Sequence, residues 1–262
     1  MRHLIFVAVF LALALSACGR ANPSSEPRTL TVYAAASLTD AFTEIGKAFE
    51  ASHPGVTVAF NFGGSQNLRT QIEQGAPADV FASANTKEME ALIASNFVAA
   101  EAPKVFLTNQ LVVILPKDNP AGIASLADLS KPALKLVLAA EEVPAGRYAR
   151  EILEKLNATF GAGFREKVLA NVVSNEDNIR QAVTKVQLGE ADASIVYISD
   201  AVAVPELQRI EIPADMNVIA EYPIAALIES PNSDLAHGFV NYVLSPDGQG
   251  TLKKWGFTPV VP

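Results

Sequence analysis

Cysteine is almost absent from this chain: only one of its 262 residues, Cys18, is a cysteine. That count excludes an intrachain disulfide and any metal site built from several cysteines. The chain also lacks the H-E-x-x-H pair, the Walker phosphate-binding loop and the dinucleotide fingerprint that mark common metal and nucleotide sites. We therefore expect no resident metal and no cofactor.

Positive charge is also in short supply. The 20 Lys and Arg residues face 28 Asp and Glu residues, which gives a formal net charge of −8 and a pI near 5.0. Nucleic-acid binders draw affinity from basic residues that neutralise phosphates, and this chain has no long Lys/Arg run. We expect no nucleic-acid partner, and any anionic ligand must be small and held locally.

The hydrophobic run at residues 4–15 is too short to span a bilayer. Its twelve apolar residues fall short of the roughly 20 that a spanning helix needs. Arg2 and His3 precede the run and small residues end it, a pattern that predicts a signal peptide over residues 1–17. Residues 19–28 (GRANPSSEPR) lack apolar periodicity and are rich in Pro, Ser and Gly, which is typical of a flexible tether.

The Leu-Ser-Ala-Cys sequence at residues 15–18 resembles a bacterial lipobox. This resemblance implies that Cys18 becomes the lipid-modified first residue of the mature protein, with residues 18–28 as its tether. The protein would then be exported and anchored to the membrane, in the periplasm or at the cell surface. The mature chain would carry 19 basic and 28 acidic residues, a net charge of −9. The alternative is an ordinary signal peptide of a protein that carries no lipid, in which Cys18 has no role.

Beyond residue 28 the chain has the pattern of a folded α/β protein. Half of its residues are hydrophobic and 18% are charged, which excludes broad disorder and allows one or two domains at this length. Short β-branched runs alternate with amphipathic helical patterns, so we expect mostly parallel sheets flanked by helices. Strands are predicted at residues 30–34, 56–61, 80–82, 111–115, 134–139, 194–197 and 222–228. Helices are predicted at residues 38–49, around 68–72, and at 145–156, 177–188 and 234–244.

Four predicted strand-to-helix junctions carry residues suited to an anion: residues 34–40, 63–66, 143–148 and 174–179. Ligands of open α/β sheets bind outside the carboxyl ends of the strands, where helix N-termini offer unpaired N–H groups and a positive dipole end. Ser37 and Ser65 have a simpler interpretation as N-caps. Two small-residue turns with serine, a Pro-Ala-Gly turn and the lack of a basic patch together favour a small-anion site built from neutral donors.

Several segments resemble the molybdate-binding proteins of bacterial ABC importers, which have the type II periplasmic-binding-protein fold. The resemblance covers nearly all of the chain after the tether. The segments are LTVYAAASLTDAF (30–42), GGSQNLRTQIEQGAPADVFASA (63–84), LVVILP (111–116), VPAGRYAREILEKL (143–156), ADASIVYISDA (191–201), YPIAAL (222–227) and GFTPV (256–260).

The resemblance implies an oxyanion held by hydroxyls and backbone N–H groups, with no charged side chain against it. Ser37 and Ser65 would each supply a hydroxyl and a backbone N–H, Ala145 a backbone N–H, and Tyr197 a phenol hydroxyl. The remaining donor would be the backbone N–H of Ile179 or of a neighbouring residue.

The same resemblance implies two α/β lobes with the ligand in the cleft between them. Lobe I would take residues 29–108 and 224–262, and lobe II residues 109–223. The strands at 111–115 and 222–226 would connect the lobes as hinges, and the ligand itself would close them.

The implied function is an extracytoplasmic solute-binding lipoprotein, a monomer, that captures molybdate and tungstate. Its further partners would be the membrane and ATPase subunits of an ABC importer. One alternative is a binding protein for another small anion such as sulfate. The other is an exported serine hydrolase with Ser37 or Ser65 as nucleophile, but the sequence around Ser65 lacks the last glycine of the G-x-S-x-G elbow, and no histidine is placed recognisably as a base. We therefore expect no enzyme activity.

Overall fold

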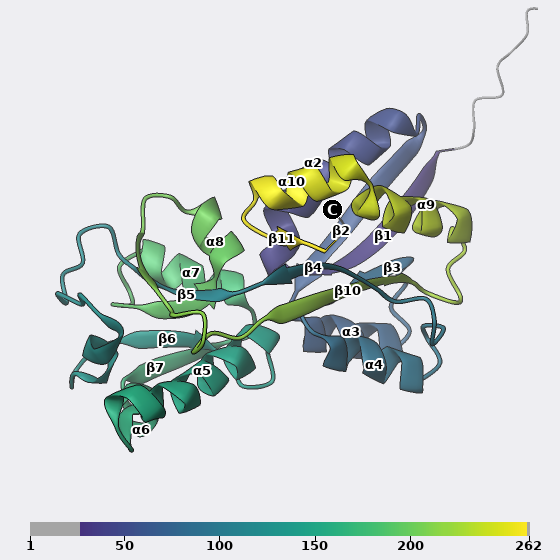
Figure 1. Cartoon of the computed structure of the whole chain (residues 1–262). Helices are drawn as coiled ribbons and strands as arrows, with labels where there is room; N and C mark the ends of the chain where they lie inside the picture. The colour runs from purple at the N-terminus through teal and green to yellow at the C-terminus, as the bar shows by residue number, and fades with distance from the viewer. Residues whose placement is uncertain (1–26, 261–262) are drawn as a thin grey trace, which may run out of the picture.

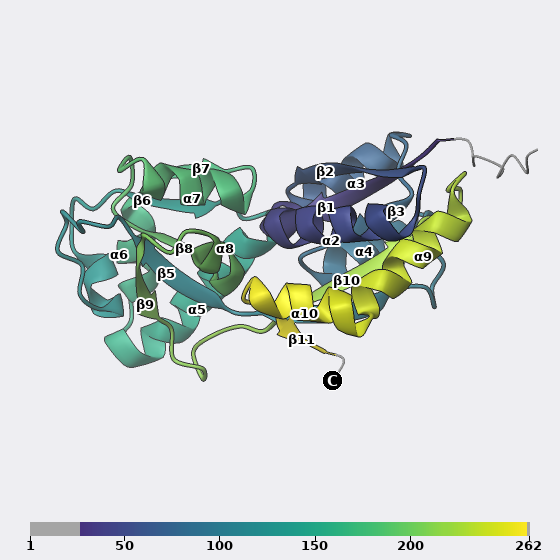
Figure 2. The same ribbon diagram turned by 90° about the horizontal axis from the view of Figure 1, so that it is seen from above.

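The computed structural model describes residues 27–260, which form two α/β lobes lying side by side (Figures 1 and 2). Lobe I contains a six-stranded sheet of order β11-β4-β10-β3-β1-β2, and lobe II contains a three-stranded sheet, β8-β5-β9, and the pair β6-β7. The strands of lobe I are β1 (Arg28–Ala35), β2 (Val56–Gly63), β3 (Val80–Ala82), β4 (Lys104–Asn109), β10 (Ala220–Ala226) and β11 (Thr258–Pro259). Those of lobe II are β5 (Leu111–Leu115), β6 (Leu136–Ala139), β7 (Val172–Glu176), β8 (Ser194–Tyr197) and β9 (Gln208–Glu211).

Helices cover both faces of each lobe (Figure 1). In lobe I, α2 (Thr39–Ser52), α9 (Ser233–Leu244) and α10 (Pro246–Lys254) lie on one face, and α3 (Ser65–Glu73) and α4 (Thr86–Ala94) on the other. In lobe II, α5 (Pro144–Phe160) and α6 (Phe164–Ala170) lie opposite α7 (Ile179–Gln187) and α8 (Ile198–Ala203). The 3₁₀ helices are η1 (Ala36–Leu38) and η2 (Leu126–Ser130). The predicted α/β fold with helix-flanked sheets is confirmed.

Strand directions differ from the mostly parallel sheets expected. β1 pairs in parallel with β2 and β3, because helices between these strands return the chain to the same end of the sheet. β10 is antiparallel to both β3 and β4, since it arrives from lobe II without a crossover helix. In lobe II, β5 is antiparallel to β8 and β9, whereas β6 pairs in parallel with β7. Both lobes therefore contain mixed pairings.

The two segments predicted as hinges are regular strands inside the lobes. β5 is buried along its whole length and pairs on both sides within lobe II, and β10 lies between β3 and β4 in lobe I. The chain instead passes from one sheet to the other at Gln110 and again through residues 212–219, between β9 and β10. β10 begins before residue 224, the limit predicted for lobe I. The residue ranges assigned to the lobes otherwise stay a prediction.

Aromatic rings fill the core of lobe I beneath α2 and α9. Phe42 is fully buried, with ring centroids of Phe106 and Phe239 at 5.8 and 5.9 Å. Such tilted and edge-to-face pairs add about 0.5–1.5 kcal/mol each beyond the burial of their area. This packing holds α2, and with it the end of β1, in a fixed position.

The first strand starts two residues earlier than predicted, at Arg28, the last residue of the predicted tether. Its guanidinium lies 2.6 Å from the Asp234 carboxylate and also donates to the Asn232 side chain, both at the start of α9. The signal peptide and Cys18 lie outside the described residues. Among the helices that the structure describes, none combines the length and apolar character that crossing a bilayer requires.

Candidate functional site

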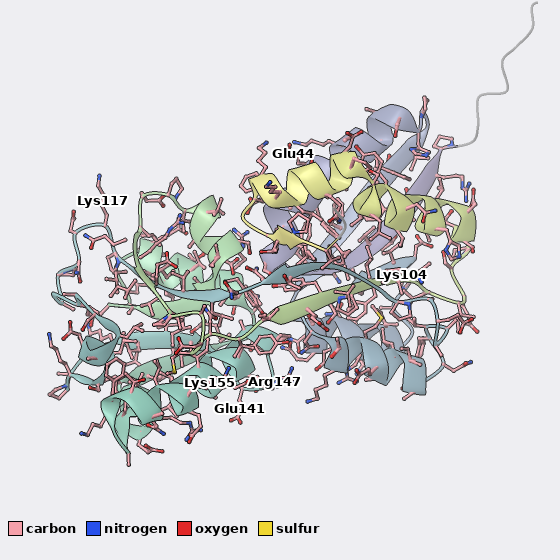
Figure 3. All side chains as sticks on the ribbon, in the orientation of Figure 1. Glu44, Lys104, Lys117, Glu141, Arg147 and Lys155 are labelled. Carbon is pink, nitrogen blue, oxygen red and sulfur yellow. The ribbon has the colours of Figure 1, made fainter. Side chains whose placement is uncertain are left out.

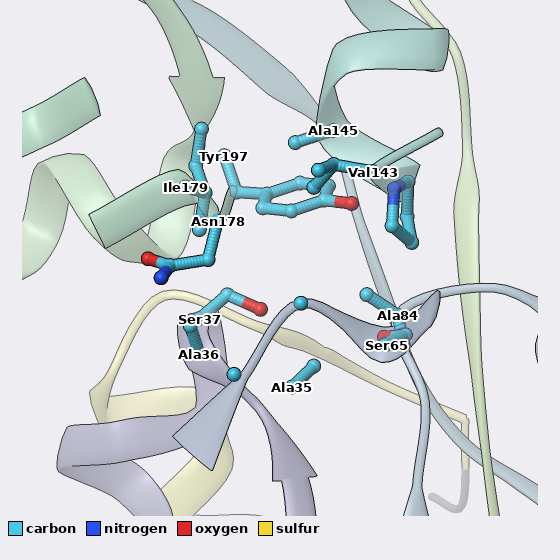
Figure 4. Close-up of a pocket in the computed structure, with 13 residues that line it drawn as sticks. Ala35, Ala36, Ser37, Ser65, Ala84, Val143, Ala145, Asn178, Ile179 and Tyr197 are labelled. Carbon is cyan, nitrogen blue, oxygen red and sulfur yellow. Dashed lines mark hydrogen bonds between the residues drawn. The ribbon is translucent and has the colours of Figure 1, made fainter. Parts of the chain in front are cut away.

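A small pocket lies between the two lobes and contains every oxyanion-binding residue predicted from the sequence (Figure 4). The space between its lining atoms, including the part that is open to solvent, is about 210 Å³. Ser37 and Ser65 lie on the lobe I side, and Ala145, Ile179 and Tyr197 face them from lobe II. The other lining residues are Ala35, Ala36, Gly63, Gly64, Ala84, Val143, Pro144 and Asn178.

Four helix N-termini meet at this pocket: those of η1 and α3 from lobe I and those of α5 and α7 from lobe II. The first N–H groups of a helix have no intrahelical acceptor, and in the longer helices α3, α5 and α7 the dipole adds partial positive charge at this end. At η1, α3 and α5 the N-cap residues are Ala35, Gly64 and Val143, and no side chain caps the N–H groups. These donors therefore stay available to a ligand in the pocket.

The start of α7 keeps one particular donor available. Asn178 is the N-cap, and its side chain accepts from the Gln181 N–H at 3.2 Å. Ile179 is the first helical residue, so its N–H precedes the capped position and has no acceptor within the helix. The N–H of Ile179 is therefore free of the helix and that of Arg180 follows it, and which of the two meets a ligand stays a prediction.

The structure does not support the interpretation of the two serines as N-caps. Ser37 is the second residue of η1, and Ser65 is the first residue of α3, after the N-cap Gly64. The Ser37 hydroxyl lies 2.9 Å from the Tyr222 hydroxyl, and the Ser65 hydroxyl accepts from the Ala84 N–H at 3.0 Å. Both serines are almost fully buried in the pocket lining, and neither side chain caps the helix in which it lies.

Tyr197 ends β8 and its phenol is buried in the lobe II side of the pocket. Its hydroxyl has no hydrogen-bond partner among the described residues. Burial, followed by the proximity of Tyr222, raises the pKa of Tyr197 well above its ordinary value. The phenol is therefore neutral at physiological pH and can donate a hydrogen bond.

No charged side chain lines the pocket. Arg147 follows the α5 N-terminus but lies over the Tyr148 ring, 5.3 Å from its centroid, and Figure 3 shows it at the start of α5 on the outside of the molecule. Within residues 27–260 no group of three His, Cys, Asp or Glu residues is placed to hold a metal ion. The polar groups of the lining are therefore hydroxyls, backbone groups and the side-chain amide of Asn178, all of them uncharged.

An ion network that crosses between the lobes was missed by the sequence analysis. Arg180, next to Ile179, pairs through one side with Asp40 of α2 in lobe I. Through Nε it lies 3.0 Å from the Asp200 carboxylate of α8, whose side chain is fully buried. The only sequence pattern at these positions is an acidic residue in the first turn of a helix, Asp40 in α2 and Asp200 in α8. Such a residue normally indicates only an interaction with the helix dipole.

Known proteins of similar sequence and structure indicate the family of this chain. Residues 30–258 match the family model described as bacterial extracellular solute-binding protein. The molybdate-binding protein ModA of Mycobacterium tuberculosis is 38% identical over 96% of this chain and 95% of its own length. That of Escherichia coli is 34% identical over 95% of this chain and 96% of its own.

Among solved structures, the periplasmic molybdate-binding protein of Azotobacter vinelandii superposes with a TM-score of 0.77, covering 89% of this chain and 99% of that one. At 20% identity this likeness concerns the fold. These relatives are solute-binding proteins rather than enzymes. The chain belongs to the family of bacterial extracellular solute-binding proteins.

Proposed function

We propose that this protein captures molybdate, and tungstate as well, in the interlobe pocket and delivers it to an ABC importer. The observation that carries the proposal is the meeting of four helix N-termini at a pocket lined by no charged side chain. Neutral donors around a small pocket suit a compact oxyanion. The names of relatives that are 38% and 34% identical over nearly the whole chain support the choice of molybdate.

In this proposal five residues hold the anion: Ser37, Ser65, Ala145, Ile179 and Tyr197. The two serines contribute hydroxyls and N–H groups, Ala145 and Ile179 contribute N–H groups, and Tyr197 contributes its phenol. Because the donors come from both lobes, a bound anion would favour the closed arrangement.

The proposal includes export and membrane attachment. The basic start, the apolar run and the Leu-Ser-Ala-Cys sequence support cleavage before Cys18 and its lipidation. The importer's membrane and ATPase subunits would receive the ligand from the anchored protein. We propose that the protein acts as a monomer.

A panel of oxyanions tests the ligand. Molybdate or tungstate at about 1,000 times its dissociation constant is expected to stabilise the protein by ~4 kcal/mol. For a protein of this size the melting temperature should rise by roughly 8–16 °C, measured by differential scanning fluorimetry. Sulfate and phosphate at the same concentration serve as comparisons. A response to sulfate with none to molybdate or tungstate would reject the assignment and favour the sulfate alternative.

Gly64→Ala tests whether binding requires the observed approach of the two lobes. A Cβ at residue 64 would lie 2.5 Å from the backbone carbonyl oxygen of Asp177 in lobe II, although the local φ of −63° and ψ of 133° suit alanine. Relieving such a clash costs about 1–3 kcal/mol, so molybdate should bind roughly 5- to 150-fold more weakly by isothermal calorimetry.

Gly250→Ala is the matched control, because a Cβ there meets nothing within 4 Å. This variant should bind molybdate like the parent. Equal affinities of the Gly64→Ala variant and the parent would show that the ligand does not need the closed arrangement.

A further inference from the structure

Tyr222 lies behind the pocket rather than in its lining. It belongs to β10 in lobe I, and its side chain is completely buried. The rings of Phe106, Tyr197 and Phe257 surround it with centroids at 6.5, 5.7 and 5.9 Å, all in edge-on geometry. These contacts fix the direction of the phenol, whose hydroxyl lies 2.9 Å from the Ser37 hydroxyl.

The direction of this hydrogen bond follows from the chemistry of the two groups. Burial raises the pKa of Tyr222 far above its ordinary value, so the phenol keeps its proton and has one O–H to donate. A phenol is a stronger acid than an alkanol and is the better donor of the pair. An anion in the pocket would attract the hydrogen of the Ser37 hydroxyl and so turn the Ser37 oxygen toward the Tyr222 O–H. Hydrogen bonds in such a chain strengthen one another. The contact at 2.9 Å allows either hydroxyl to donate, and donation from Tyr222 to the Ser37 oxygen leaves the Ser37 hydrogen for the pocket.

Ser65 is oriented in the same sense by a different group. A backbone N–H can only donate, and the Ala84 N–H lies 3.0 Å from the Ser65 oxygen. One of the two acceptor lone pairs of each serine hydroxyl is thus engaged by the protein, and each O–H can point toward a ligand. Toward the ligand they act as donors, alongside the backbone N–H groups of the four helix N-termini.

We propose that Tyr222 is a positioning residue that makes Ser37 a donor and so biases the pocket toward fully deprotonated oxyanions. The inference rests on the proposed function, and it concerns the selectivity of the same site. Molybdate and sulfate carry no proton at neutral pH, whereas hydrogen phosphate keeps one and needs an acceptor for it. Without Tyr222 donating to it, Ser37 could turn and accept that proton.

A double-mutant cycle for molybdate affinity tests the coupling. Tyr222→Phe keeps the ring and removes the hydroxyl, and it should weaken molybdate binding roughly 3- to 10-fold, the value of one ordinary hydrogen bond. In a Ser37→Ala background the same change should have no further effect, because its effect passes through the Ser37 hydroxyl. Tyr242→Phe, whose ring packs on Phe49 in α2, is the matched control and should leave affinity unchanged.

Anion selectivity is a readout that a purely structural role would not change. Competition calorimetry against molybdate should show that hydrogen phosphate gains roughly 3- to 10-fold relative to sulfate in Tyr222→Phe. An unchanged ratio of phosphate to sulfate, or an equal loss of molybdate affinity with and without the Ser37 hydroxyl, would overturn the inference. If the unmodified protein fails to bind molybdate and tungstate, the proposed function itself is wrong.

Discussion

Arg180→Met is expected to lower the free energy of unfolding by about 3–5 kcal/mol at neutral pH, the usual cost of leaving a buried charge without its partner. Asp200 is fully buried, and the guanidinium at 3.0 Å is its charge partner. Methionine keeps much of the length of the side chain but carries no charge. Urea denaturation followed by circular dichroism measures the difference.

The loss of stability caused by Arg180→Met should depend on pH. Burial raises the pKa of Asp200 to about 6, and Arg180 acts in the opposite direction. In the unfolded chain the Asp200 carboxyl titrates near its ordinary pKa of about 3.9. Between about pH 4 and pH 6 the folded protein therefore binds this proton more tightly than the unfolded chain does, and the free energy of unfolding falls as the pH rises through this range. Without Arg180 the pKa of Asp200 rises further, and the fall in the free energy of unfolding continues to higher pH. The variant should therefore be close to the parent near about pH 4.5 and show the full deficit near about pH 7.5.

Asp200→Asn provides the matched rescue, because it removes the charge that Arg180 balances. The double variant Arg180→Met, Asp200→Asn should recover most of the lost stability at neutral pH. A deficit that is equal at both pH values and persists in the double variant would show that the arginine acts through packing rather than charge.

Ser37→Ala and Ser65→Ala are each expected to weaken molybdate binding roughly 10- to 150-fold. The estimate takes a hydrogen bond to a charged group as worth about 1.5–3 kcal/mol. Each change also leaves a buried group in the protein without its partner, the Tyr222 hydroxyl in one case and the Ala84 N–H in the other. Calorimetry on the folded variants separates the loss of affinity from any loss of stability.

Ser245→Ala is the control for these two variants. Ser245 is an N-cap of α10, accepting from the Gly248 N–H at 3.3 Å, and it does not line the pocket. Its loss should cost about 1 kcal/mol of stability and leave affinity unchanged. Affinities of the Ser37 and Ser65 variants within twofold of the parent would remove both serines from the proposed site.

Strongly patterned parts of the fold were predictable from the sequence. The run Leu111–Leu115 is apolar throughout and is a buried strand, and α5 begins at Pro144, where proline suits a first helical turn. Weaker patterns were not recognised. β7 (Val172–Glu176) mixes valine with polar residues because only part of it is buried, and α10 contains two glycines, which disfavour a helix unless packing supports it.

The same contrast applies to the site. The residues whose main-chain groups line the pocket follow small-residue turns, so Ser37, Ser65 and Ala145 stood out locally. The partners of those groups come from distant parts of the chain: Tyr222 is 185 residues from Ser37, and Arg180 meets Asp40 across 140 residues. Contacts of this kind depend on how β10 and α7 are brought to the cleft, which no local pattern encodes. Strand direction was missed for the same reason.

The attachment of Arg28 to the start of α9 determines which part of the molecule a lipid on Cys18 would hold. β1 begins at the end of lobe I remote from lobe II (Figures 1 and 2), and ten residues of chain reach at most about 35 Å. With its anchor in a bilayer, lobe I would thus stay within that distance of the membrane surface. Lobe II would carry no attachment of its own. It could therefore move when the cleft opens and the ligand enters or leaves, while lobe I and its tether stay in place.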